Sequence, residues 1–153
     1  MNKVILGKYV NTHGIKGEIR IKSIFPYKDK VFKVGNELII ENNTYTINSY
    51  RVHKGYDMVT LKEITSINDI LFPKNISVFI DRDKYLLKNE YLDDDLIGFF
   101  VYNSKFEREV LDIVYINERK KLIKTTNGFI PFELVREIDF KNKKILIEEV
   151  EGL

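Results

Sequence analysis

Residues 11–23 have the sequence NTHGIKGEIRIKS, in which a turn leads directly into a strand. Gly14 and Gly17 supply backbone angles that other residues resist, as a tight turn requires. In the following segment, EIRIK, polar and apolar residues alternate, which predicts a β-strand with its isoleucines facing a core. The same alternation places Arg20 and Lys22 on the outward face. The stretch therefore predicts a turn on the rim of a small β-barrel that presents basic side chains.

Two other hypotheses compete for this stretch, a catalytic loop and a phosphate-binding loop. A catalytic base needs an orienting partner, and His13 has only Glu18 near it in sequence. The chain contains no cysteine and two histidines, too few for most histidine metal sites. The G-x-x-G at residues 14–17 is similar to a loop that clamps nucleic-acid backbone, but that loop joins helices, whereas strand patterns flank this one. We therefore expect no catalytic residue and no metal ligand.

Strand patterns dominate the rest of the first half. The segment NELIIENNTYTINSYRVH predicts two strands around a turn at Asn42 and Asn43, and YDMVTLKEI predicts another. One short helix is expected in TSINDILFPKN, where Ser66 can cap the helix, Asp69 follows three residues later and Pro73 ends it.

The second half repeats the β pattern. LIGFFVYN, REVLDIVYI, KLIKTTN and KKILIEEV are strand candidates, and DFKNKKIL predicts a hairpin with a tight turn at Lys141 and Asn142. In GFIPFELV, Pro131 favours a strand end or a single helical turn over a central strand. Phe99 and Phe100 are adjacent, so one should face the core and the other should face outward or into a domain interface. The charged segment at residues 82–89 is expected to be the boundary between two small β-barrels.

The composition narrows the functional classes. The absence of cysteine excludes disulfides, thiol catalysis and cysteine-ligated zinc, and fits a reducing cytosol. The first ten residues do not resemble a signal peptide, and no apolar run approaches the roughly 20 residues that a membrane helix needs. Residues 1–85 hold 14 Lys and Arg against 9 Asp and Glu, whereas residues 86–153 hold 11 against 14. A basic first half and an acidic second half suggest different partners, although an imbalance of this size is also compatible with chance.

A second basic loop has the sequence RVHKG and carries Arg51, His53 and Lys54. If this loop and the first one share a rim, their side chains form a cationic patch suited to phosphate contacts. Ordinary solvated loops would show the same charges.

The segment LGKYVNTHGIKGEIRIKS resembles the opening signature of the RimM family, bacterial 16S rRNA processing proteins that act as assembly factors for the small ribosomal subunit. The residues that match the family motif T-H-G-x-K-G-E-[VI]-R-V are Thr12, His13, Gly14, Lys16, Gly17, Glu18 and Arg20. Further similar segments follow in the same order, namely FKVGNELII, RVHKGYDMVTLK, NEYLDDDLIG, GFIPF, VREIDFKNKKILIE and EGL.

The resemblance implies an all-β chain of two small β-barrels, a RimM N-terminal barrel at residues 1–84 and a C-terminal PRC-type barrel at residues 90–153, joined by a short linker. It implies a cytoplasmic, non-enzymatic protein that binds immature 30S subunits through 16S rRNA and a ribosomal protein of the head, the nineteenth of the small-subunit series. We expect a monomer with no cofactor and no membrane association.

The expected binding residues fall into two groups. The rRNA and subunit contacts are Thr12, His13, Lys16, Arg20, Lys22, Arg51, His53 and Lys54. Tyr91 and Leu92 are the expected contacts to the ribosomal protein, at a position where the family usually has two aromatic residues. Two alternatives stay open, an RNA-acting enzyme that uses His13 as acid or base and a PRC-barrel adaptor that binds only protein.

Overall fold

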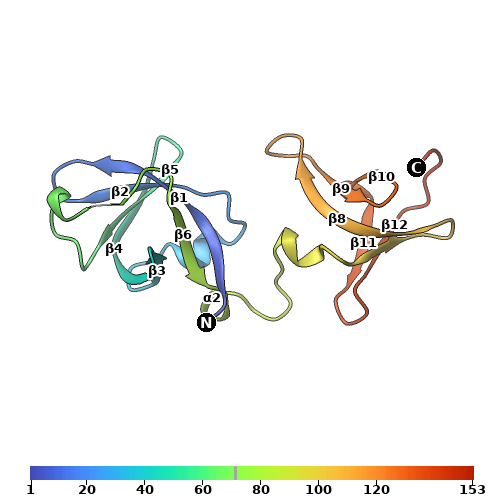
Figure 1. Ribbon diagram of the computed structural model, residues 1–153, viewed down its shortest axis with the longest axis horizontal. Coiled ribbons are helices and arrows are strands. Elements are labelled where there is room, and N and C mark those ends of the chain that lie inside the picture. Colours follow the sequence, from blue (N-terminus) through green and yellow to red (C-terminus); the bar gives the residue numbers. More distant parts are fainter. Residues whose placement is uncertain (71) are drawn as a thin grey trace. The chain divides into compact units, whose positions relative to one another are not determined.

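The computed structural model describes residues 1–70 and 72–153. β-Strands dominate it, which confirms the all-β prediction, and the chain forms two compact units, Met1–Glu90 and Tyr91–Leu153 (Figure 1). The strands of the first unit are β1 (Lys3–His13), β2 (Glu18–Lys22), β3 (Glu37–Ile40), β4 (Asn43–His53), β5 (Tyr56–Leu61) and β6 (Ser77–Asp81). Those of the second unit are β7 (Phe100–Tyr102), β8 (Glu107–Tyr115), β9 (Lys121–Thr125), β10 (Gly128–Pro131), β11 (Val135–Asp139) and β12 (Lys144–Ile147).

The sheet of the first unit closes on itself in the order β1-β2-β5-β4-β3-β6, because β6 pairs back onto β1. All its strand pairs are antiparallel. The inward residues form a dense apolar core in which Ile19, Ile21 and Leu38 are fully buried. This confirms the predicted inward direction of the isoleucines in EIRIK.

The turn between β3 and β4 lies one residue earlier than the sequence predicts. Ile40 pairs with Asn43, so the turn residues are Glu41 and Asn42, with φ of 51° and 65°. A two-residue hairpin turn of this kind needs positive φ at both central positions, and asparagine tolerates that conformation well. The prediction of Asn42 and Asn43 was therefore wrong by one residue, since either asparagine of the pair could occupy the second position.

The predicted short helix is a single 3-10 turn, η1 (Ile67–Asp69). Ser66 caps it and the Asp69 side chain bonds back to the Ser66 N–H, which confirms the predicted cap. The helix ends before Pro73, and Leu71 lies outside the described residues.

A second helix, α1 (Lys28–Val31), was not predicted from the sequence. The buried carboxylate of Asp57 on β5 accepts hydrogen bonds from Lys28 at 2.8 Å and from the Tyr50 hydroxyl at 2.7 Å. The Tyr50 ring stacks on Phe32 at 5.0 Å between centroids. Tertiary contacts thus hold this single turn of helix, which is too short to carry a periodic signal.

The end of the first unit is held by a further turn, α2 (Arg82–Tyr85), and by Glu90. The Glu90 carboxylate pairs with Lys30 and accepts the Leu87 N–H at 2.7 Å, and the Glu90 carbonyl accepts from Arg82 at 3.3 Å. The division between the units therefore falls after Glu90. The domain limits of 1–84 and 90–153 stay a prediction.

The second unit is a six-stranded sheet in the order β10-β9-β8-β7-β12-β11. The pair β7–β12 is parallel and the others are antiparallel. The family resemblance predicts that this sheet closes into a barrel, and that closure stays a prediction. The core contains Leu96, Phe99 and Ile123, whereas Phe100 is exposed, which confirms the predicted opposite directions of the two phenylalanines.

The predicted turns of the second unit are largely correct. Pro131 ends β10 and precedes a single 3-10 turn, η3 (Phe132–Leu134). The strand end that the sequence predicts at Pro131 is therefore confirmed. The predicted hairpin joins β11 to β12, but its loop is longer than a tight turn because Asp139 pairs with Lys144. The strands β10 and β11 were not among the four strand candidates of this half, and the sequence indicated them only as a strand end at Pro131 and as one arm of the hairpin.

Candidate functional site

The first turn of interest joins β1 to β2. His13 pairs with Glu18, and Gly14 and Gly17 have φ of +73° and +78°, so both glycines occupy the left-handed region as the sequence predicts. A Cβ on Gly17 would lie 3.2 Å from atoms of Ile64 and Ser66, whereas one on Gly14 would meet open space. The turn is therefore fixed against the segment that leads into η1 on the Gly17 side and free on the Gly14 side.

The second turn joins β4 to β5 through Lys54 and Gly55, with φ of 51° and 79°. His53 pairs with Tyr56 across it. Because Arg20 and Arg51 both pair with Met58 of β5, the antiparallel register places the two turns at opposite ends of the β2–β5 pair. The hypothesis that both loops share one rim is therefore wrong.

Side chains from both turns nevertheless meet on the outer face of the sheet. We call this set the outer-face cluster and define it as His13, Glu18, Arg20, Arg51, His53 and Tyr56. Arg51 crosses β5 to form a two-pronged ion pair with Glu18, at 2.9 Å from Nε and 2.7 Å from Nη2. These bonds hold the pKa of the Glu18 carboxyl below its usual value. Arg51 is thus already paired within the protein.

Arg20 occupies the centre of the cluster. Its Nη2 donates to Nδ1 of His13 at 3.0 Å, and its guanidinium carbon lies 5.4 Å from the centre of the Tyr56 ring. Its Nε is buried without a hydrogen-bond partner, and in the part of the chain that the structure describes no carboxylate forms an ion pair with it. The positive charge of Arg20 is therefore not neutralised within the protein.

The two histidines of the chain lie side by side, with ring centroids 5.6 Å apart. An arginine side chain can only donate, so His13 must accept through an unprotonated Nδ1 in this arrangement. Partial desolvation and the positive charges of Arg51 and Lys54 lower the pKa of His53. The environment of His53 therefore favours its neutral form.

Three exposed lysines lie near members of the cluster along the chain. Lys16 lies in the first turn and Lys54 in the second, and Lys22 follows Arg20 by two residues on the same face of β2. With the two arginines and Glu18, the face carries five cationic side chains against one carboxylate. Such a face can bind phosphate oxygens by charge and by hydrogen bonds from guanidinium groups.

Thr12 is the predicted subunit contact that the structure separates from this face. It pairs with Ile19, whose side chain is fully buried in the core, so Thr12 is directed toward the interior.

The sequence analysis did not assign Glu18 and Tyr56 to the site. Glu18 and Arg51 are 33 residues apart, so no local pattern could reveal their ion pair. The register of β2 and β4 on β5 supplies this information, and it emerges only once the sheet has formed.

Tyr91 and Leu92 begin the second unit. The Tyr91 ring is half-buried, lies 5.5 Å from that of Phe140 and packs against the core of the unit. The Leu92 N–H donates to Asp95 at 2.8 Å and so caps the 3-10 turn η2 (Asp93–Leu96). Of the three consecutive aspartates, Asp95 therefore caps the turn.

Asp93 holds the start of this unit against β8 and β9. It accepts from the Tyr115 hydroxyl at 2.6 Å and pairs with Lys121 at 2.8 Å. The hydrogen bond to Asp93 raises the pKa of Tyr115 to about 12. These contacts fix the backbone next to Tyr91.

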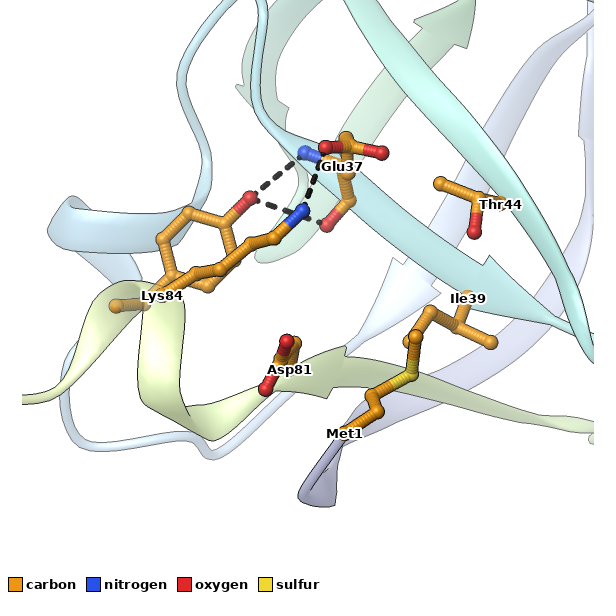
Figure 2. A pocket seen from close by; sticks show the side chains of 7 residues that line it. Met1, Glu37, Ile39, Thr44, Asp81 and Lys84 are labelled. Atoms are coloured by element: carbon orange, nitrogen blue, oxygen red, sulfur yellow. Dashed lines mark hydrogen bonds and ion pairs between the residues drawn. The ribbon is translucent and has the colours of Figure 1, made fainter.

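A small pocket of the first unit lies near the N-terminus and is lined in part by Met1, Glu37, Ile39 and Lys84 (Figure 2). Lys84 pairs with Glu37 at 2.8 Å, and the Tyr85 hydroxyl accepts the Glu37 N–H at 2.8 Å. These bonds attach α2 to β3, which gives the polar groups of this pocket a structural role.

Within residues 1–70 and 72–153, no three His, Cys, Asp or Glu side chains form a group that could hold a metal ion. None of the helices described there is long and apolar enough to cross a membrane.

Comparison with known proteins identifies the family. The model of the RimM N-terminal domain matches residues 4–85, which is more than half of the chain. The chain belongs to the RimM family. It is 38% identical over 170 aligned residues to the ribosome maturation factor RimM of Staphylococcus aureus strain MRSA252, an alignment that covers 99% of this chain and 98% of that protein. The same values hold for the RimM of the bovine strain RF122 / ET3-1.

A solved structure described as a putative 16S ribosomal RNA processing protein RimM from Pseudomonas aeruginosa also resembles the chain. The TM-score is 0.46 and the sequence identity 17%, over 99% of this chain and 100% of the other.

Proposed function

We propose that this protein is a ribosome maturation factor that acts in the cytoplasm on the small subunit, without enzymatic activity. Family membership supports the general role, because the relatives in Staphylococcus aureus are named ribosome maturation factors. The finer steps are our proposal. The first unit binds 16S rRNA of the immature 30S subunit, and the second binds a ribosomal protein of the head, the nineteenth of the small-subunit series.

The observation that carries the rRNA contact is the uncompensated charge of Arg20. A buried Nε without a partner and a guanidinium without a carboxylate are costly unless a ligand supplies an anion. The phosphates of RNA are such anions, and Lys16, Lys22 and Lys54 extend the cationic surface around Arg20. We therefore assign phosphate binding to the outer-face cluster and these lysines.

The partner of the second unit is proposed from charge and from the position of Tyr91. Residues 91–153 hold 10 Lys and Arg against 13 Asp and Glu, an excess of three negative charges that complements the basic character of ribosomal proteins. Tyr91 offers a large ring with a polar hydroxyl, which suits an interface anchor, and Leu92 adds apolar area beside it.

Sedimentation tests the overall proposal. The protein should co-sediment with immature small subunits and not with complete ribosomes. It should leave precursor rRNA uncut and unmodified when it is the only protein present, because the unprotonated ring nitrogen of His13 already accepts from Arg20 and is not available as a base. Cleavage or modification of that RNA by the purified protein would favour the enzymatic alternative, and association with head protein but never with subunits would favour the adaptor.

The salt dependence of subunit binding tests the phosphate face. If ~3 phosphates are contacted, log K should fall with log salt at a slope of about −2 to −3. A Lys16/Arg20/Lys22→Ala variant should bind more weakly with a shallower slope. Lys3→Ala is a matched control, because Lys3 is exposed and lies at the opposite end of β1 from His13 and beside Asn42, at the opposite end of β4 from His53. An unchanged slope in the triple variant would rule out the proposed face.

A further inference from the structure

The outer-face cluster contains both imidazoles of the chain. The protonation of His13 is linked to the hydrogen bond that it accepts from Arg20. In the free protein, Nδ1 of His13 is the acceptor for the Arg20 guanidinium at 3.0 Å, so His13 cannot carry a proton there while this bond exists. His53 lies 5.6 Å from His13 between ring centroids. A positive charge on either ring would therefore lie beside the other ring and beside Arg20.

The charged groups around the two rings come from every neighbouring element. Glu18 and Arg20 lie on β2, Arg51 on β4, Lys54 on the turn after His53, and Tyr56 on β5. Lys16 belongs to the turn after His13, and Asp69 lies on η1, which contacts that turn through the bond from the Ile67 N–H to the Ile15 carbonyl at 3.2 Å. Glu18 is engaged by Arg51, and Asp69 by Ser66. The cations outnumber the carboxylates around the rings, and the pKa of His53 is lowered.

A phosphate group on this face would reverse that balance. Its oxygens would replace His13 as the acceptor for the guanidinium of Arg20, which releases Nδ1. Its negative charge would favour the protonated form of each nearby imidazole, and a protonated imidazole donates through both nitrogens. Binding of the anion and uptake of protons are then coupled in both directions.

We propose that His13 and His53 form a proton-linked phosphate-binding pair, so that RNA binds this face together with protons taken up from solvent. The inference rests on the proposed function, and it adds that the rRNA contact strengthens as the pH falls from about 7.5 to 6, the range in which histidine titrates. His13 exchanges its role from acceptor of an arginine N–H to donor toward phosphate.

The composition makes the test unusually direct. The chain has two histidines and no cysteine, so both side chains that ordinarily titrate in this range belong to the site. The probe is a twelve-nucleotide oligouridylate, because uracil and phosphodiester groups do not titrate in this range. Its affinity is measured between pH 7.5 and 6.0 at one ionic strength, and the two imidazoles are followed by NMR in the same full-length protein.

The affinity for oligouridylate should rise about tenfold between pH 7.5 and 6.0, and the titration midpoints of both imidazoles should move to higher pH when the RNA is added. His13→Gln and His53→Gln should each remove part of this rise, and the double variant should remove it. Lys3→Gln loses one charge at the opposite end of β1 from His13 and should keep the pH dependence. The α-amino group of the chain also titrates near neutral pH, but it is present in every variant. It therefore does not affect the difference in pH dependence between variants.

An affinity that changes less than about twofold over this range in the wild-type protein would overturn the inference, as would an unchanged pH dependence in the double variant. The NMR titration needs no substitution, so a variant that fails to fold leaves the test intact. Absence of oligouridylate binding also overturns it. Sedimentation with immature subunits is measured separately, so failure of the proton linkage is distinguishable from failure of the proposed function.

Discussion

At the scale of single residues, Glu18 determines how much positive charge the outer face offers to a ligand. Its side chain is only 14% exposed and is held by both nitrogens of one edge of Arg51. Arg51 is therefore the neutralised arginine of the cluster, and Arg20 is the arginine left for an anion. Two arginines that look equivalent in the sequence have different roles because one carboxylate lies within reach of only one of them.

Glu18→Gln should strengthen RNA binding and weaken the fold. The substitution removes a negative charge and frees Arg51, so the salt slope of RNA binding should steepen by about 1. The pKa of Glu18 is lowered in the folded state from its ordinary value of 4.5, so its contribution to the free energy of unfolding is complete above that value and is lost as the pH falls through the folded-state pKa. Urea denaturation at several pH values measures this.

The difference in unfolding free energy between wild type and Glu18→Gln should accordingly be largest above about pH 5 and should shrink in more acidic solution. Glu37→Gln is the matched control in the same unit, because Glu37 also pairs with one cation but its side chain is 41% exposed. A stability difference for Glu18→Gln that is independent of pH would contradict the assignment of the ion pair.

At the scale of elements, the two glycines of the first turn differ in what surrounds them. Both have positive φ, but only Gly17 lies against the segment before η1, where the Ser66 carbonyl and the Ile64 side chain would lie 3.2 Å from a Cβ. Gly17 therefore fixes the position of the turn by packing, whereas Gly14 only supplies a backbone angle that the turn needs. This explains how the loop that carries Lys16 keeps a fixed position.

Gly14→Ala and Gly17→Ala form a matched pair that separates backbone strain from crowding. Gly14→Ala should lower the unfolding free energy by about 1 kcal/mol, the cost of a side chain in the left-handed region. Gly17→Ala should cost more, because its Cβ would also press on backbone atoms of Ser66 at 3.2 Å. Chemical denaturation gives both values, and an equal or smaller loss for Gly17→Ala would contradict the packing at this turn.

Much at this scale is predictable from local sequence, and the exceptions have physical reasons. The glycine turn, the Ser66 cap and the strand end at Pro131 each depend on residues next to one another, so the sequence reveals them. The helix α1 depends on the buried Asp57, 29 residues from Lys28, and no local pattern shows it. The outer-face cluster likewise cannot be predicted from local sequence, because its side chains meet only through the register of four strands.

At the scale of the whole molecule, the charge division found in the sequence falls on the two units. Residues 1–90 hold 15 Lys and Arg against 10 Asp and Glu, an excess of five positive charges, and residues 91–153 have an excess of three negative charges. Each unit has its own core, so the two binding functions proposed here belong to separately folded parts of one chain.

Tyr91→Ala should weaken binding of the head protein by roughly 30-fold, the effect of losing about 2 kcal/mol at an interface anchor. The same change removes a ring that packs on Phe140, so a modest fall in the melting temperature is expected as well. Tyr91→Phe keeps that packing and should lower the melting temperature less than Tyr91→Ala does. Titration of the head protein into each full-length variant, with melting curves alongside, measures both effects; wild-type affinity in Tyr91→Ala would remove Tyr91 from the interface.

The closed order of the first sheet has a consequence for amide hydrogen exchange. Every strand of that sheet has a partner on both sides, and β5 is enclosed by β2 and β4, so its amides should exchange with deuterium only when the whole unit opens. In the second sheet the outermost strands β10 and β11 each have one partner in the described pairing, so their outward amides should exchange first. The slowest amides of the protein should therefore belong to the unit that carries the histidines, and the outer-face cluster should keep its geometry while the edges of the second unit open and close.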